Sequence, residues 1–133
     1  MNTKTFSGKD LIKNAHLLKI ICEPNRLMLL EKIIEGIHCN CELGQALQIA
    51  PNLISHHLSV LREAGLINAE RDPMDNRWVY YSINPIMMDD LQSFFSEFFN
   101  KDRIQPRGAT CGPKITEKQR ESLLRMTHKY FFP

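Results

Sequence analysis

The first 64 residues alternate between apolar and polar positions at helical spacing. Apolar side chains recur every three or four residues in four stretches, which Pro24, Gly36 and Pro51 separate. Pro24 suits the first turn of a helix, because its missing N–H would have no partner there anyway. Gly36 suits the end of a helix. The pattern predicts helices at about residues 9–23, 25–35, 42–48 and 53–64.

The fourth predicted helix has two chemically distinct faces. Ile54, Leu58 and Leu61 are spaced four and three residues apart, so they share one face, which we expect to be buried. His57 lies nearer to this face, where a hydrogen-bonded structural role is expected. A helix, a short turn and a second helix with a polar outer face form the helix-turn-helix pattern. The polar face comprises Asn52, Ser55, His56, Ser59 and Arg62.

Strand-like sequence follows the helix terminator Gly65. Residues 66–71 and 77–83 are rich in β-branched or aromatic residues or alternate in polarity, which is typical of strands. Residues 72–76, DPMDN, have the composition of a turn. A hairpin directly after a helix-turn-helix is the winged-helix arrangement, so we expect a mainly α fold with a β-hairpin wing. The side chains expected in the hairpin core are Trp78, Tyr80 and Tyr81.

A strongly apolar helix is predicted at residues 85–102, and it includes four phenylalanines. So many phenylalanines on one helix exceed what a small domain leaves to solvent, and apolar patches of that size usually mark an interface. We expect a dimer formed through terminal helices; packing in the core of the monomer is the alternative. Residues 105–113, QPRGATCGP, are predicted to form a mobile arm. A last helix is expected at about residues 116–131.

Composition sets bounds on the protein. A length of 133 residues, with 43% hydrophobic and 24% charged residues, suits one globular domain, and a net charge of +2 says little about partners. No apolar run approaches the roughly 20 residues that cross a bilayer, and the N-terminus lacks the apolar segment of a signal peptide. We therefore expect a cytoplasmic protein without a membrane partner. In that reducing compartment, the cysteines are expected to be thiols: Cys22, Cys39, Cys41 and Cys111.

Three motifs in this order resemble the ArsR/SmtB family of metal-responsive winged-helix repressors. They are LKIICEPNRL at residues 18–27, SHHL followed by LREAGLI at residues 55–67, and RWVYY at residues 77–81. The resemblance covers roughly residues 10–102. It implies a homodimer that binds double-stranded operator DNA at an inverted repeat and loses DNA affinity when a metal binds.

The residue types on the predicted surface fit such a role. Ser and Asn bond base edges or phosphates, and Arg favours guanine or phosphate. The polar face of the fourth helix, namely Asn52, Ser55, His56, Ser59 and Arg62, is therefore the candidate DNA-reading surface. Arg71, Asn76 and Arg77 would carry the wing to the flanking backbone or minor groove, although plain solvation of these hairpin residues is an equal alternative.

Cys39-Asn40-Cys41 lies where similar proteins carry a Cys-x-Cys pair at the start of the third helix. On a regular helix two such side chains diverge by roughly 200°, so they can hold one ion only if the chain there is extended or becomes so. Metal binding should therefore strain or unwind the start of this helix. We also expect the helix N-terminus to favour the thiolate form, which is the metal ligand.

The arsenic-sensor pattern of the family places a third cysteine three residues after the pair, where this chain has Gly44. Cys111 is the preferred replacement, from the same subunit or its partner, and Cys22 is the alternative. Three thiolates select a soft ion: arsenite or antimonite fits best, and cadmium, lead or mercury nearly as well. The adjacent His38 could also make the site capable of binding zinc. The family's other site, on the last interface helix, looks absent because residues 84–102 contain no histidine.

These expectations divide the chain into two parts. Residues 1–104 would form the winged-helix DNA-binding and dimerisation domain, and residues 105–133 a C-terminal arm and helix carrying Cys111. Two rival functions stay open: a winged-helix repressor whose cysteines sense oxidation, and a metal carrier without a DNA function. An enzyme with a small organic substrate is not expected, because no nucleophile–base pair, phosphate loop or acidic pair is evident.

Overall fold

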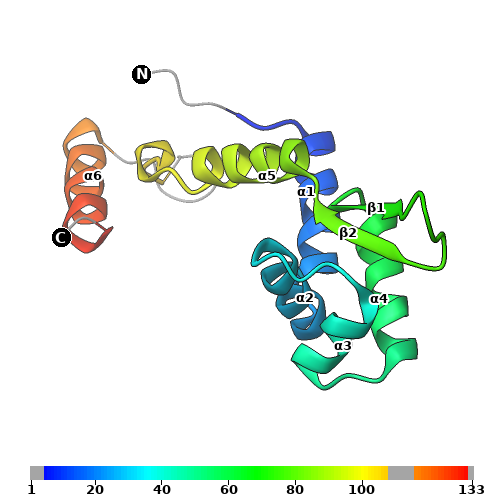
Figure 1. The fold of residues 1–133 in the computed structure, drawn as a ribbon. Coiled ribbons are helices and arrows are strands. Elements are labelled where there is room, and N and C mark those ends of the chain that lie inside the picture. Colours follow the sequence, from blue (N-terminus) through cyan, green and yellow to red (C-terminus); the bar gives the residue numbers. More distant parts are fainter. Residues whose placement is uncertain (1–4, 108–115, 132–133) are drawn as a thin grey trace. The chain divides into compact units, whose positions relative to one another are not determined.

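The computed structural model describes residues 5–107 and 116–131. Four helices precede the hairpin and helical segments follow it (Figure 1). This order confirms the predicted mainly helical, winged helix-turn-helix fold. The elements are α1 (Gly8–Ile21), α2 (Pro24–Ile34), α3 (Asn40–Leu47), α4 (Pro51–Glu63), β1 (Ile67–Arg71), β2 (Val79–Ile83), α5 (Pro85–Phe98), the short 3-10 helix η1 (Lys101–Arg103) and α6 (Glu117–Phe131).

The chain falls into two compact units, one of which spans Phe6–Gln92. The residues from Ser93 onward belong to the second unit, so that α5 crosses the boundary. The predicted boundary between residues 104 and 105 stays a prediction. The first unit contains the helix-turn-helix and the hairpin, and it is the unit that carries the candidate site.

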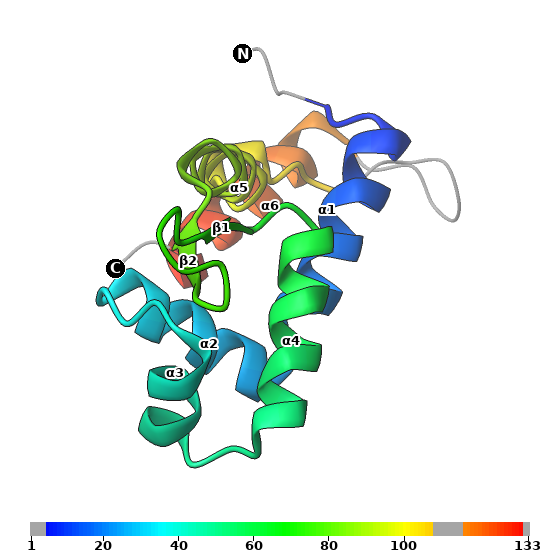
Figure 2. The ribbon, with the colours of Figure 1, turned by 45° about the vertical axis from the view of Figure 1, so that its right-hand side comes forward.

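The core of the first unit lies where α2, α3, α4 and the hairpin meet (Figure 2). The apolar face predicted for the fourth helix is buried: Ile54 and Leu61 are fully buried and Leu58 is 1% exposed. Removal of this aliphatic surface from water is the main term that holds α3 and α4 against each other. The buried cluster consists of Leu29, Ile33, Leu43, Ile54, Leu58, Leu61, Leu66 and Ile67.

A polar network around His57 fixes α4 against the junction of α1 and α2. His57 is buried, as the sequence predicts, and its Nδ1 lies 3.4 Å from Nη1 of Arg26. The same guanidinium donates through Nε to the Ile20 carbonyl, in the last turn of α1, at 2.6 Å. Glu23 caps α2 by accepting from the Arg26 amide at 3.0 Å. Buried polar groups need such partners, so His57 has a structural role.

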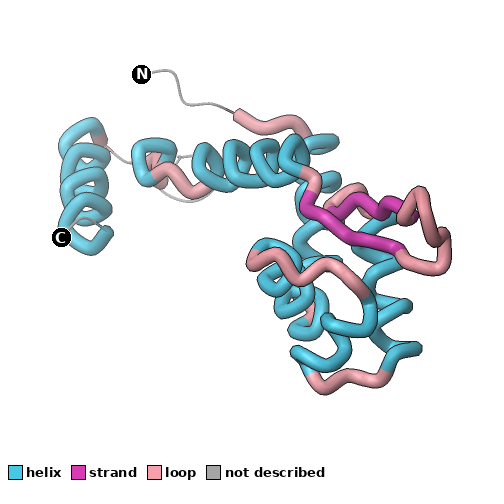
Figure 3. The backbone as a smooth tube through the Cα atoms, viewed as in Figure 1, coloured by secondary structure: helices cyan, strands magenta, loops and turns pink. Residues whose placement is uncertain are grey.

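The hairpin pairs β1 with β2 in antiparallel register from Ile67↔Ile83 to Arg71↔Val79. Figure 3 shows its turn projecting beyond the ends of both strands. Gly65, with φ of +79°, ends the helical segment before β1, a conformation that glycine adopts without strain. The turn at Gly65 therefore fixes the register in which the strand residues alternate between the core and solvent.

Several predicted boundaries shift. The third helix begins at Asn40 rather than residue 42, and the helix predicted at 85–102 ends at Phe98. The second strand begins at Val79 rather than residue 77. Trp78 precedes the strand and is 49% exposed, so its predicted place in the hairpin core is wrong. Its backbone closes the turn instead: its amide donates to the Asp75 carbonyl at 3.1 Å, and its carbonyl accepts from the Asp72 amide at 2.9 Å.

Candidate functional site

The polar side chains of α4 form one exposed stripe. Pro51 occupies the first turn of α4, which extends the helix two residues before the predicted start. All five predicted members of the stripe are exposed, and their spacing of three or four residues keeps them on one side of the helix. This surface offers hydroxyl, amide, imidazole and guanidinium groups to a partner. Its members are Asn52, Ser55, His56, Ser59 and Arg62.

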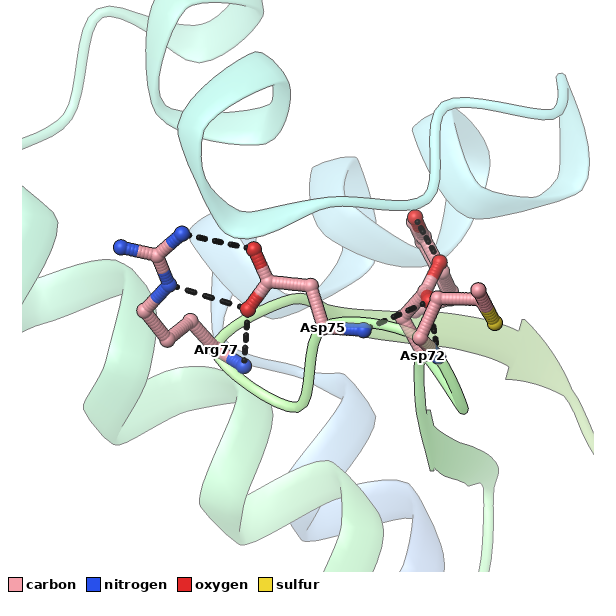
Figure 4. A network of polar contacts seen from close by, with 5 residues as sticks. Asp72, Asp75 and Arg77 are labelled. Carbon is pink, nitrogen blue, oxygen red and sulfur yellow. Dashed lines mark hydrogen bonds and ion pairs between the residues drawn. The ribbon is translucent and has the colours of Figure 1, made fainter.

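Asp72 organises the turn of the wing (Figure 4). Its Oδ1 accepts from the backbone amides of Met74 at 2.8 Å and Asp75 at 3.1 Å, and its Oδ2 accepts from the Tyr80 hydroxyl at 2.9 Å. The two amide bonds, followed by the Tyr80 bond, lower the pKa of Asp72. The bond to Asp72 in turn raises the pKa of Tyr80. The turn is therefore held by one ionised carboxylate.

The two wing arginines have partners inside the wing. Asp75 receives two bonds from the Arg77 guanidinium, at 2.9 Å from Nε and 2.7 Å from Nη2 (Figure 4). This pair lowers the pKa of Asp75 and raises that of Arg77. Arg71 donates to the Asn76 carbonyl at 2.8 Å. All three predicted wing residues are exposed, but Asp75 offsets the charge of Arg77.

The two cysteines at the start of α3 lie in different environments. Cys39 is the N-cap, with extended backbone angles of φ −115° and ψ 151°, and only 5% of it is exposed. Cys41 lies in the first helical turn and is exposed. An open hollow of about 670 Å³ borders Cys41 and Gly44, so this thiol is accessible. The extended backbone predicted as one condition for shared ion binding is thus present at Cys39 and ends at Asn40.

The prediction that the helix N-terminus favours the thiolate form is wrong for Cys39. Burial raises the pKa of the Cys39 thiol, and the Glu42 carboxylate and Cys41 raise it further. The Glu42 backbone amide acts in the opposite direction, as a helix N-terminus should, but is outweighed. Because burial desolvates the charged form, the Cys39 thiol holds its proton more tightly than an exposed thiol does.

Residues 38–41, which we call the cysteine segment, contact both the wing and α4. Cys39 forms an antiparallel bridge with Tyr80, and the Tyr81 amide donates to the His38 carbonyl at 2.8 Å. On the other side, Asn40 Nδ2 donates to Ser55 Oγ at 3.0 Å. Neither contact was predictable from the sequence, because both join residues far apart in the chain and no local pattern indicates them.

The described residues do not complete a metal site. Among the side chains that the structure describes, in residues 5–107 and 116–125, no three from His, Cys, Asp or Glu are grouped so that they could hold an ion. Cys22, exposed at the C-cap of α1, therefore does not join Cys39 and Cys41. Cys111, the preferred third ligand, lies outside the described residues. A Cβ at Gly44 would stand 3.4 Å from the Ile49 carbonyl oxygen, an ordinary contact distance.

A buried three-helix core, an exposed polar stripe on the second helix of the helix-turn-helix and an adjacent hairpin define a winged helix-turn-helix regulator. Residues 23–69 match the family described as "Bacterial regulatory protein, arsR family". The arsenic resistance transcriptional regulator ArsR1 of Pseudomonas putida is 33% identical over 89 residues, which cover 64% of this chain and 67% of that protein. The chain belongs to the ArsR family of transcriptional regulators.

Solved structures agree with this assignment. The crystal structure of a possible transcriptional regulator for arsenical resistance is 29% identical, with a TM-score of 0.55 over 65% of this chain and 86% of that chain. A homodimeric winged helix-turn-helix DNA-binding domain from Mycobacterium bovis shares the fold at 19% identity, with a TM-score of 0.54 over 72% and 88% of the two chains. In the described part of this chain, no helix is long and apolar enough to cross a membrane.

Proposed function

We propose that this chain is a metal(loid)-responsive transcriptional repressor. It binds double-stranded operator DNA as a homodimer and leaves the operator when a thiophilic ion binds cysteine thiolates. Arsenite or antimonite is the preferred effector, followed by cadmium or lead, with zinc as a weaker candidate. The homodimer is supported by the M. bovis relative of the same fold and by the row of phenylalanines on α5.

In the DNA complex that we propose, α4 enters the major groove and the wing contacts the flanking backbone or the minor groove. In a helix-turn-helix dimer the second helix reads base edges, and the half-sites lie about 34 Å apart. The exposed stripe on α4 supplies the required donors and acceptors. The contacts we propose come from Asn52, Ser55, His56, Ser59 and Arg62 on α4 and from Arg71, Asn76 and Arg77 on the wing.

The observation that carries the proposal is the position of the cysteine segment. It bonds to α4 through Asn40 and to the wing through Cys39 and His38, so a change in its backbone reaches both proposed DNA-binding elements. Cys39 is buried before the first turn of α3 and Cys41 is exposed within it, so we expect one ion to bind both sulfurs only if this turn opens. That opening would break the bond from the Leu43 amide to the Cys39 carbonyl, which is 3.0 Å long.

The donor set decides the class of ion. Two thiolates from the cysteine segment and a third from Cys111 form a sulfur site, which selects soft, thiophilic ions over magnesium or calcium. Cys111 belongs to the proposed C-terminal part, residues 105–133, and comes from the same subunit or its partner. Arsenite and antimonite, which bind three sulfurs, fit this set best.

An operator-release assay tests the function. The protein first enriches its own site from a random duplex library, and fluorescence anisotropy then follows that duplex under strict reductant with arsenite, antimonite, cadmium, lead or zinc. We expect Cys39→Ser, Cys41→Ser and Cys111→Ser to keep DNA binding and lose the response, while Cys22→Ser behaves like the parent. If Cys111→Ser still leaves the operator when the ion is added, Cys111 is not the third ligand. Release by an oxidant but by none of the ions would mean that the cysteines sense oxidation. Absence of DNA binding would favour a metal carrier.

A further inference from the structure

The side chain between the two cysteines is bonded to the proposed DNA-reading surface. Asn40 Nδ2 donates to Ser55 Oγ at 3.0 Å across the interface of α3 and α4. We infer that Asn40 is a positioning residue, which orients the Ser55 hydroxyl for DNA and transmits ion binding at its neighbours to α4. This inference rests on the proposed function and adds the route by which the ion acts.

The direction of the hydrogen bond gives Asn40 this role. An amide nitrogen only donates, so Ser55 Oγ is the acceptor and its own proton is left to donate elsewhere. Phosphate oxygens and the N7 and O6 atoms of guanine are acceptors of that proton. Without Asn40, a helical serine is free to turn its hydroxyl back to the carbonyl four residues earlier, here that of Pro51. Asn40 therefore keeps Ser55 in the state that can bond DNA.

The position of Asn40 makes the bond sensitive to an ion. Asn40 is the first residue of α3, between Cys39 in extended conformation and Cys41 in the first turn. Drawing both sulfurs to one ion requires rotation of the peptide units on each side of Asn40. Its side chain then moves relative to Ser55, which α4 holds in place through Ile54 and Leu58. Ion binding should therefore break this bond without separating the two helices.

The buried contact between α3 and α4 is apolar and does not include this bond. Leu43 and Ile54 are fully buried in one cluster. Loss of one partly exposed hydrogen bond should therefore leave the fold intact. Its effect should appear in DNA affinity, and in the difference that the ion makes to that affinity.

A double-mutant cycle on the full-length protein tests the inference. It measures affinity for the duplex that the protein enriched from the random library, with sodium arsenite and cadmium chloride as the ion probes. We expect Asn40→Ala and Ser55→Ala each to weaken ion-free DNA binding about threefold to tenfold. The double variant should be no weaker than the weaker single variant, because both changes remove one contact. Ser55→Thr, which keeps the hydroxyl, should restore affinity. Gln45→Ala is the control, an exposed amide on α3 that the inference leaves out.

The ion response provides the readout that a merely structural residue would not change. Because the ion-bound parent already lacks the bond, Asn40→Ala should lower the ratio of ion-free to ion-bound affinity by the same factor by which it weakens ion-free binding. Cadmium–thiolate absorption should remain, and the melting temperature should match that of Gln45→Ala. Additive losses in the cycle, or the full parental ratio in Asn40→Ala, would overturn the inference. A parent that binds DNA but ignores both ions would instead refute the proposed function, and the ion-free cycle would still decide whether Asn40 positions Ser55.

Discussion

At the scale of single residues, Cys39 and Cys41 have different chemistry although one residue separates them. Cys39 is buried under the hairpin and paired through its backbone with Tyr80, whereas Cys41 faces solvent. In the proposed mechanism, the exposed thiol of Cys41 contacts the incoming ion first. Cys39 would then bind after a local opening, which would couple capture of the ion to a change in structure.

Asp72 shows how one carboxylate determines the shape of the wing. It accepts two backbone amides and the Tyr80 hydroxyl, and these bonds hold its pKa below the ordinary value near 3.8. A carboxyl whose pKa is lowered by folding stabilises the folded state above its unfolded pKa. This contribution is lost as the pH falls through the folded pKa.

The first prediction concerns Asp72→Asn, which imitates the protonated carboxyl. We expect its melting temperature to lie below that of the parent near neutral pH, and the difference to shrink as the pH falls below about 4. Thermal unfolding followed by circular dichroism between pH 3 and pH 7 measures this. Asp90→Asn, at an exposed position of α5, is the control and should show no comparable trend. A difference for Asp72→Asn that is constant with pH would contradict the assignment.

At the scale of elements, the two faces of α4 should separate stability from DNA binding. Leu58 is 1% exposed in the core, and its neighbour Ser59 lies on the exposed stripe. Truncation of a buried leucine removes transfer free energy and leaves a cavity. Truncation of an exposed serine removes only a donor and an acceptor from the proposed DNA surface.

The second prediction compares these neighbours. Leu58→Ala should lower the free energy of unfolding by about 2–5 kcal/mol, whereas Ser59→Ala should change it by less than about 0.5 kcal/mol. Ser59→Ala should nevertheless weaken DNA binding. Urea unfolding and anisotropy with the enriched duplex give the two quantities. Unchanged DNA affinity in Ser59→Ala would remove this residue from the proposed surface.

The wing carries the third prediction, because Asp75 offsets the charge of Arg77. Asp75→Asn should release Arg77 for phosphate, tighten DNA binding at low salt and steepen the slope of log K against log salt by up to about 0.9. Glu70→Gln removes the same charge from the exposed side of β1 and is the matched control. An equal gain in both variants would show a general charge effect instead of the release of Arg77.

The helices and the hairpin were predictable because each is encoded by local periodicity and by residues such as Pro24 and Gly65. The exposed stripe on α4 followed from the same periodicity. Contacts that depend on tertiary structure were not predictable. The bridge between Cys39 and Tyr80 is one, and the burial that raises the pKa of the Cys39 thiol is another. The pairing of Arg77 with Asp75 also depends on a turn geometry that composition alone does not fix.

At the scale of the whole molecule, the proposed dimer depends on α5, of which no residue is buried within the described chain. The phenylalanines of α5 and the adjoining Phe99 stack on one another, with ring centroids 5.8 Å apart for Phe94 and Phe98 and 5.9 Å apart for Phe95 and Phe99. Phe99 is 70% exposed. A second copy of the chain would bury this aromatic surface.

The fourth prediction is that Phe99→Glu weakens the dimer at least tenfold, on the order of 1.4 kcal/mol or more, because an unpaired charge would enter an apolar interface. Sedimentation equilibrium measures the dissociation constant. Ser93→Glu places the same charge on the exposed side of α5 opposite the phenylalanines and should leave the dimer intact. If Phe99→Glu remains as tightly dimeric as Ser93→Glu, the interface lies elsewhere.

The central claim is that ion capture by Cys39 and Cys41 opens the first turn of α3. Hydrogen exchange at the Leu43 amide, measured by NMR on the DNA-free protein with and without arsenite, tests it most directly, because this amide donates to the Cys39 carbonyl. We predict exchange at least about tenfold faster with arsenite, equivalent to about 1.4 kcal/mol of lost protection, and no change in Cys39→Ser. Unchanged protection of Leu43 in a protein that binds arsenite and releases its operator would contradict the claim.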